Sequence, residues 1–384
     1  MGFKLSRHDI RFLHFMYKIG NILGIVPVYN FENFKITAPR LNKIYASFLF
    51  VLEIAGTLWI IYVRNFDTNI RFFTMSFKIL GSCDTLLLAL LKASVIIGVS
   101  YCKQGAWSKL NNKFQFVDKK LNNRDRQEKN FLKNVYVYFA LAHSLYLICV
   151  VYTFTIRMLE KGYLVLKLFI LIEFNAYYDF YLQMLLYNIA LAFKARYQQL
   201  NEQLLHVNTG TAKKNSVYFI KEIGRLSRLL GEMVGIFNNV FGLPLVFIIG
   251  RCVIKTLASL IFFTSTLYID NDSLKERLVI SSVAQTVFII VSWTKFLLIL
   301  ACDAARSESY KTVFLCYKLR EKFPDKSEEQ KELLQLAQIV EVNKANFSAA
   351  DFFDVNRNTL FGIFGTITTY LIVTIQFNEN TKSQ

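Results

Sequence analysis

The chain has 384 residues, of which 54% are hydrophobic, and it contains 36 Phe and only 4 Pro. Apolar runs of about 20 residues recur along it, and this is the length needed to cross the hydrocarbon core of a bilayer. The formal net charge is +17, but the basic residues lie between the apolar runs rather than along one face or groove. This composition excludes a set of soluble domains and a nucleic-acid-binding protein, and it indicates a polytopic membrane protein.

The first 43 residues are rich in Lys and Arg and lack an apolar core followed by a small-residue cleavage site. We therefore expect no cleaved secretory signal, so the first membrane span serves as the insertion signal. Residues 9–29 are apolar, but Lys18 interrupts them and they stop at Gly24 and Pro27. This segment is short for a span and is typical of an interfacial helix.

Seven apolar segments predict seven transmembrane helices and an all-α fold. The predicted spans are residues 44–63, 77–99, 134–155, 168–193, 237–263, 278–301 and 360–377.

The distribution of Lys and Arg predicts the orientation of these spans. The segments on one side hold 32 of these residues and those on the other side hold 8. The positive-inside rule then predicts a cytosolic N-terminus and an extracellular C-terminus. In this topology Asn271, in an Asn-Asp-Ser sequon of the third outer loop, is a candidate glycosylation site, whereas Asn346 is cytosolic and stays unmodified.

The long cytosolic segments contain helical patterns. Residues 103–133 and 194–236 combine charge with apolar residues at helical spacing. Ser327 to Gln330 form a capping-box pattern, followed by a broad apolar stripe up to Val342. These segments are either helical extensions that pack on one another or an interface between subunits.

The sequence shows no motif for catalysis or for cofactor binding. The four histidines are scattered, and the chain has no Cys-x-x-Cys, no phosphate-binding glycine motif and no nucleophile elbow. We expect neither enzyme activity nor a cofactor or metal. The six cysteines are expected to be packing residues without disulfides.

Ten ionisable residues fall inside predicted spans, where such groups are costly and usually face protein or water. Asp84 is six residues after Lys78 and eight before Lys92, and neither spacing brings them together on one helix face, so Asp84 needs a partner on another helix. The ten residues are Glu53, Lys78, Asp84, Lys92, His143, Glu173, Asp179, Arg251, Lys255 and Lys295.

Span directions place several polar residues at similar depth, in the middle or outer half of the membrane. An outward-opening cavity lined by aromatic and hydroxyl groups would suit a small organic ligand. The alternative is a set of interhelical hydrogen bonds and ion pairs that hold the bundle together. The candidate pocket residues are Asp84, Tyr146, Tyr152, Glu173, Tyr177, Lys255, Ser282 and Gln285.

The last span has no ionisable residue within it and is rich in threonine. Such a helix suits a pore lining that wets when open, with an apolar ring such as Phe377 that dewets it when closed. The alternative is close helix packing at Gly362 and Gly365. Glu379 follows two residues after Phe377, so copies of it could ring the outer mouth and concentrate cations.

The nine residues 369–377 have the form Thr-Tyr, five mostly apolar residues, then Gln-Phe. Together with the Phe352–Phe353 segment upstream, they resemble the signature of the insect gustatory receptor family. The resemblance implies a ligand-gated, non-selective cation channel that assembles as a homo- or heterotetramer. It implies that the last span lines the pore, with Thr369, Tyr370 and Val373 along it and the gate at Gln376 and Phe377.

The resemblance also implies a division of the chain. Residues 1–43 would be a cytosolic segment, 44–301 the ligand-binding bundle, 302–359 the cytosolic anchor, 360–377 the pore span and 378–384 an extracellular tail. The expected partners are a small-molecule tastant, permeating cations, membrane lipids and other receptor subunits, in the plasma membrane of sensory dendrites. Leu371 stands where family members that sense many sugars tend to have an acidic residue, which favours a bitter, pheromone-like or other contact-chemosensory ligand.

Two other functions remain as alternatives. A metabotropic seven-span receptor is disfavoured by the predicted orientation and by the lack of an Asp-Arg-Tyr-like triplet after the third span. A secondary transporter is disfavoured because the chain shows no internal repeat, and Pro244 is the one candidate for a broken helix.

Overall fold

The computed structural model describes residues 16–30, 35–36, 39–66, 75–121, 125–161, 165–207, 213–267 and 293–382. It is all-α apart from two short hairpins, as the sequence predicts. The helices are α2 (Pro39–Phe66), α3 (Met75–Ile97), the π-helical turn η2 (Gly98–Cys102), α4 (Gln104–Leu121), α5 (Asp125–Lys161), α6 (Val165–Leu205), α7 (Lys213–Leu267), α9 (Thr294–Arg320), α10 (Glu328–Val342) and α11 (Arg357–Lys382). The antiparallel hairpins pair β1 (Tyr29–Asn30) with β2 (Lys35–Ile36) and β3 (Ser348–Ala349) with β4 (Phe353–Asp354).

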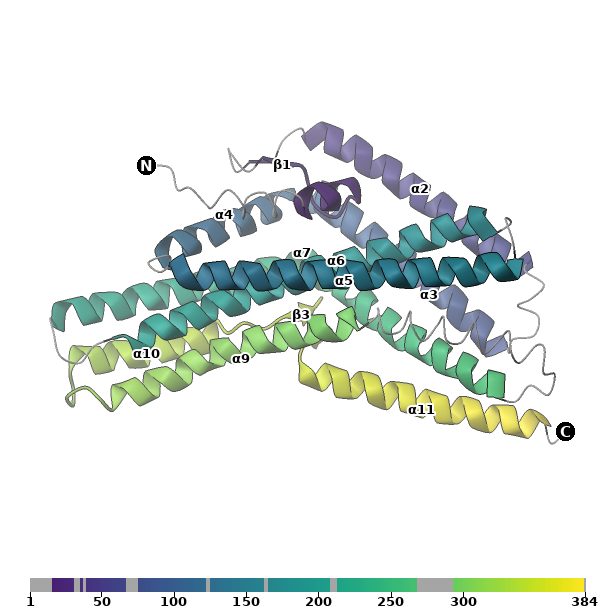
Figure 1. Cartoon of the computed structure of the whole chain (residues 1–384). Helices are drawn as coiled ribbons and strands as arrows, with labels where there is room; N and C mark the ends of the chain where they lie inside the picture. The colour runs from purple at the N-terminus through teal and green to yellow at the C-terminus, as the bar shows by residue number, and fades with distance from the viewer. Residues whose placement is uncertain are drawn as a thin grey trace.

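The long helices continue beyond the predicted spans. Helix α7 has 55 residues and begins at Lys213, well before the predicted fifth span, and Pro244 lies inside it without ending it. Figure 1 shows α4, α10 and the start of α7 at one end of the molecule, and α2, α3 and α11 at the other. The first end contains the segments predicted to be cytosolic, and their described parts are largely helical, as their patterns predict.

Four described helices are long and apolar enough to cross a membrane by length and composition. The qualifying stretches are Arg40–Tyr62, Ile79–Cys102, Val137–Thr155 and Ser216–Ile261. Helices α6 and α11 cover the predicted fourth and seventh spans, and α6 carries Asn175 and Asp179, while α11 is rich in threonine. Of the predicted sixth span, only residues 293–301 are described.

The described part of the N-terminal segment packs against the bundle, and the predicted interfacial position of the segment stays a prediction. Residues 16–22 are helical, and Ile25 and Val26 are 0% and 2% exposed. The Tyr181 hydroxyl donates a hydrogen bond to the Met16 carbonyl. The segment packs in the core because its apolar residues find partners inside the bundle.

The N-cap of α10 at Ser327 is confirmed, but the reciprocal half of the predicted capping box does not form, because the Gln330 side chain accepts from the Lys326 backbone and not from that of Ser327. The Ser327 hydroxyl accepts a hydrogen bond from the Gln330 backbone at 3.3 Å, which satisfies a backbone donor of the first turn. Leu333, Leu336 and Val340 are buried where α10 packs on α7 and α9. The stripe therefore packs within the subunit, whereas Val342 is 83% exposed.

The linker between α10 and α11 is fixed to α7. The Asn238 amide donates to the Asn346 carbonyl at 2.7 Å and accepts from the Ser348 backbone at 3.1 Å. Gly231 and Gly242 permit this approach, because a Cβ at either position would meet linker backbone atoms at less than 3.0 Å. The start of α11 is thereby held rigidly against the middle of α7.

Candidate functional site

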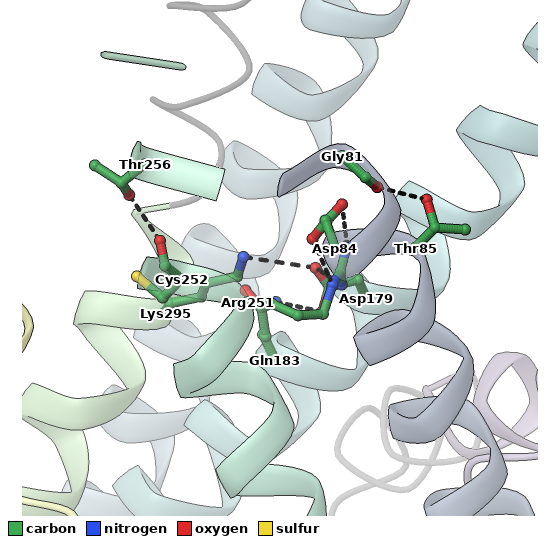
Figure 2. Close-up of polar contacts among 9 residues, drawn as sticks. All are labelled: Gly81, Asp84, Thr85, Asp179, Gln183, Arg251, Cys252, Thr256 and Lys295. Carbon is green, nitrogen blue, oxygen red and sulfur yellow. Dashed lines mark hydrogen bonds and ion pairs between the residues drawn. The ribbon is translucent and has the colours of Figure 1, made fainter. Parts of the chain in front are cut away.

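A buried cluster of charged side chains lies at the predicted depth of the membrane, centred on Arg251 of α7. Arg251 is 1% exposed. Its Nε donates to Asp84 Oδ1 of α3 at 2.9 Å, and its Nη1 lies 2.6 Å from Asp179 Oδ2 of α6. Figure 2 shows the guanidinium between the two carboxylates. The predicted interhelical partner of Asp84 is therefore confirmed, and it is Arg251.

Hydrogen bonds extend this cluster to a fourth helix. The Gln183 amide donates to Asp179 Oδ1 at 2.7 Å, and the Thr294 hydroxyl of α9 donates to Gln183 Oε1 at 2.5 Å. Lys295 Nζ lies 3.7 Å from Asp179 Oδ2. A continuous polar connection thus crosses α3, α7, α6 and α9, the kind of network that holds helices together where water is scarce.

A second buried cation, Lys92 of α3, joins two further helices. Its ammonium donates to Glu53 Oε2 of α2 at 2.7 Å and to the Asn175 side chain of α6. The same ammonium lies 5.1 Å from the ring centroid of Tyr178, a cation–π contact. Lys92 is 1% exposed, and these contacts satisfy its buried charge. Lys92 and its partners therefore form a second polar cluster beside the Arg251 cluster.

An aromatic cluster lies between α5 and α6. The Tyr146 ring stacks on Phe180 with centroids 4.7 Å apart and lies 5.6 Å from Tyr177. The Tyr146 hydroxyl donates to the Glu173 backbone carbonyl at 3.2 Å. Phe180 follows Asp179 directly, so the aromatic cluster and the Arg251 cluster occupy neighbouring faces of α6.

The structure brings together some of the predicted pocket residues. Tyr146, Glu173 and Tyr177 meet in the aromatic cluster, while Asp84 belongs to the Arg251 cluster. Lys255, one helical turn beyond Arg251, interacts electrostatically with Asp84 and Asp179. Tyr152 does not join either cluster and is 37% exposed, and Ser282 and Gln285 lie outside the described residues.

Sequence reasoning did not assign Gln183, Thr294, Asn175 or Phe180 to the site. The spacing of Asp179 and Gln183, four residues apart on one helix, was a usable signal for the first of these. The others became partners only through the packing of different helices, which no spacing along the chain reports. The predicted glycosylation site Asn271 also lies outside the described residues.

Helix α11 packs on the subunit through one narrow stripe. Ile363 and Ile367 are 4% and 5% exposed, and α11 contacts α7 and α9. Thr369 and Gln376 are exposed on the opposite side of the helix. Figure 1 shows α11, in yellow, along one edge of the molecule.

The threonines of α11 satisfy their hydroxyls locally. Thr366, Thr368 and Thr369 each donate to the carbonyl four residues earlier, at 2.8–2.9 Å. This back-bonding lets a hydroxyl-rich face stay dry without unsatisfied donors, and it leaves each oxygen able to accept from water. Phe377 and Glu379 lie in the last part of α11, and their side chains are outside the described residues.

Comparison with known proteins identifies the family. The family model described as 7tm Chemosensory receptor matches residues 13–381. The chain belongs to this family. Its members are insect chemosensory receptors that act as ligand-gated cation channels, not enzymes, so the resemblance to insect gustatory receptors is confirmed and the chain is a membrane protein.

Individual members of the family are similar to this receptor over different lengths. Gustatory receptor for sugar taste 43a of Drosophila melanogaster is 28% identical over 171 residues, which are 44% of this chain and 38% of that protein. The match thus spans well under half of that relative's length. The match supports the family assignment. The sugar in that relative's name is a ligand of that relative.

Solved structures show that the fold is shared. The insect olfactory receptor OR5 from Machilis hrabei superposes with a TM-score of 0.66 at 13% identity, covering 96% of this chain and 99% of that one. The structure of OR5 in complex with eugenol gives a TM-score of 0.61 at 14% identity, with the same coverage. The predicted fold class is confirmed.

Proposed function

We propose that this receptor is a tastant-gated, non-selective cation channel in the plasma membrane of sensory neurons, formed by four subunits whose α11 helices line a central pore. The family assignment supports the channel activity.

The exposed face of α11 is the observation that carries the pore assignment. Ile363 and Ile367 are buried and Phe364 stacks on Phe296, while most of the other described side chains of α11 are exposed. The exposed side carries Thr369 and Gln376, seven residues and therefore almost two full turns apart, so both lie on one line along the helix. Val373, between them, is also exposed. Four such lines facing one axis would form a narrow polar pore.

We place the gate at Gln376 and Phe377, near the end of α11 that the charge distribution predicts to be extracellular. Tyr370 is 57% exposed on the same helix, six residues before Gln376. The rigid connection of the α11 start to α7 through Asn238 supports a gate at the other, distal end. A conformational change in the bundle would then move α11 about its fixed beginning.

We propose that the tastant binds beside the aromatic cluster and the Arg251 cluster, where Tyr177 and Glu173 of α6 meet Tyr146 of α5. Aromatic faces with a few convergent polar groups suit a small organic molecule. Leu371 favours a bitter or other non-sugar ligand, whereas the Drosophila relative is named for sugar taste. Both classes therefore belong in the first panel of ligands.

Cysteine accessibility tests the pore assignment. The receptor is expressed alone, currents are recorded with a panel of sugars, alkaloids and hydrocarbons, and a charged thiol reagent is applied from outside. We expect Thr369→Cys and Gln376→Cys to lose current on modification when the ligand is present. Ile367→Cys, a residue in the buried stripe of the same helix, is the matched control and should be insensitive.

The alternatives predict other results. If modification of Ile367→Cys blocks the current while Thr369→Cys does not respond, α11 does not line the pore with its exposed face. A ligand response that needs G proteins and gives no current in excised patches would support the metabotropic alternative. Tags at each end of the chain, probed on intact cells, test the predicted orientation independently.

A further inference from the structure

A cavity of about 760 Å³ opens between α4 and α7, and its lining residues on α7 come 19 to 26 residues before Arg251 on the same helix. We call it the α4–α7 groove. Its charged lining residues are Lys109 and Lys113 of α4 with Arg225, Arg228 and Glu232 of α7. Both helices belong to the segments predicted to be cytosolic, and the charge distribution alone gave no reason to expect a cavity there.

The groove carries excess positive charge. Lys113 forms an ion pair with Glu232, the single carboxylate of the lining. Arg225 lies over the Phe116 ring, 5.9 Å from its centroid. Lys109 and Arg228 are exposed and have no ion pair or hydrogen bond with any residue that the structure describes.

The ion pairs beside the groove do not relieve this excess. Lys120 pairs with Glu222 at 3.0 Å, and Lys221 pairs with Glu332 at 3.2 Å. The neighbouring carboxylates are therefore already neutralised by other lysines. Cations held close together repel one another, and a bound anion removes this repulsion.

Contacts along α4 and α7 show how close the groove lies to the membrane. The two helices run antiparallel, with Lys103 donating to the Asn239 carbonyl at one end and Lys120 paired with Glu222 at the other. Asn239 lies within the predicted fifth span. Arg228 is nine residues before the predicted start of that span, which is about 14 Å along a helix. The groove therefore begins at the inner surface of the bilayer and extends below it.

We propose that the α4–α7 groove binds the polyphosphorylated headgroup of an inositol lipid from the inner leaflet. Guanidinium forks bind phosphate oxygens in a bidentate manner, and lysine ammonium groups add point charges. A headgroup with phosphates on its inositol ring reaches further from the bilayer than that of phosphatidylserine. Its several charges match the excess of cations over the single carboxylate in the lining. The inference is independent of the tastant and of the pore assignment.

Direct binding is the primary test. Purified full-length receptor is titrated with short-chain phosphatidylinositol 4,5-bisphosphate at fixed salt. The double variant Lys109→Gln/Arg228→Gln should bind about 25-fold more weakly, since each basic residue near an anionic membrane lipid contributes about fivefold. The matched control is Lys318→Gln/Arg320→Gln, which removes the same two charges from the exposed end of α9 and should change the affinity less than twofold.

A variant that should bind the lipid more tightly makes the test independent of misfolding. Glu232→Gln removes the carboxylate from the lining and releases Lys113, so it should tighten binding by about fivefold. A misfolded receptor would not gain affinity. Equal affinities for the groove variant, the α9 control and the unaltered receptor would overturn the proposal.

Two further measurements identify the source of the phosphates. Vesicles with phosphatidylserine at the same total charge should bind the receptor without sensitivity to the groove variant. Depletion of the inositol lipid by a phosphatase in the recording membrane should reduce the ligand-evoked current. If soluble inositol trisphosphate binds as tightly as the lipid and depletion has no effect, the lipid assignment is wrong.

Discussion

Replacing Arg251 by methionine should destabilise the receptor far more than replacing Asp84 by asparagine. The arginine is 1% exposed and neutralises two carboxylates from two other helices. Without it, Asp84 loses its ion pair with Arg251, and the ion pair of Asp179 with Lys295 is the longer one, at 3.7 Å. Breaking a buried pair by removing one partner costs about 3–5 kcal/mol because a charge is left uncompensated.

The asparagine substitution has a smaller expected cost. In the Asp84→Asn variant the amide oxygen can still accept from Arg251 Nε, and the arginine keeps its contact with Asp179. The Asp84 side chain is also more exposed than that of Asp179, at 22% against 6%. The expected loss of folding stability is about 1 kcal/mol, because a charge-assisted hydrogen bond is replaced by a weaker, neutral one.

The assay compares the unaltered receptor, both single variants and the double variant. Solubilised protein is heated in steps, and the fraction that remains a monodisperse assembly is measured by fluorescence-detected size exclusion. Because Asp84 and Arg251 are in contact, their effects should not add, and the coupling should lie between about 0.5 and 3 kcal/mol.

Ligand potency separates the two interpretations of Asp84. If this residue forms part of the tastant site, Asp84→Asn should shift the dose–response curve while the assembly stays intact. Loss of the surface assembly with an unchanged dose–response curve would support a purely structural role. Equal destabilisation by Asp84→Asn and Arg251→Met would refute the reasoning that Arg251 is the centre of the cluster.

Three further predictions concern the gate, the outer mouth and the cysteines. Phe377→Ala should raise the ligand-independent current by weakening a hydrophobic gate, and a well-expressed variant without basal current would argue against that role. Glu379→Gln should lower divalent permeation or unitary conductance, and unchanged values would remove Glu379 from the mechanism. A maleimide that cannot cross membranes should label the exposed Cys102 in permeabilised cells but not in intact cells, because we predict that it is cytosolic. Burial raises the pKa of the Cys316 thiol to about 12, so Cys316→Ser should leave the labelling unchanged, and a fall in labelling would contradict its burial.

The cysteines illustrate how far a residue type predicts its environment. Cys149, Cys252, Cys302 and Cys316 are buried, as expected of packing residues, while Cys102 is exposed at the end of η2. All six are free thiols. The sequence predicted the general environment, but the exposure of Cys102 depends on how η2 and α4 leave the membrane.

The sequence by itself determined the all-α membrane fold, the helical segments between the predicted spans, the cap of α10 and the family signature at the end of the chain. These features depend on hydropathy over about 20 residues and on contacts within a few residues, which the order of the chain specifies directly. Tertiary structure alone decided that Arg251 pairs with both Asp84 and Asp179, that residues 16–26 enter the core, and that α4 and α7 leave a basic groove between them. Those contacts join residues up to 167 positions apart, so they depend on the register and rotation of packed helices, which no local pattern fixes.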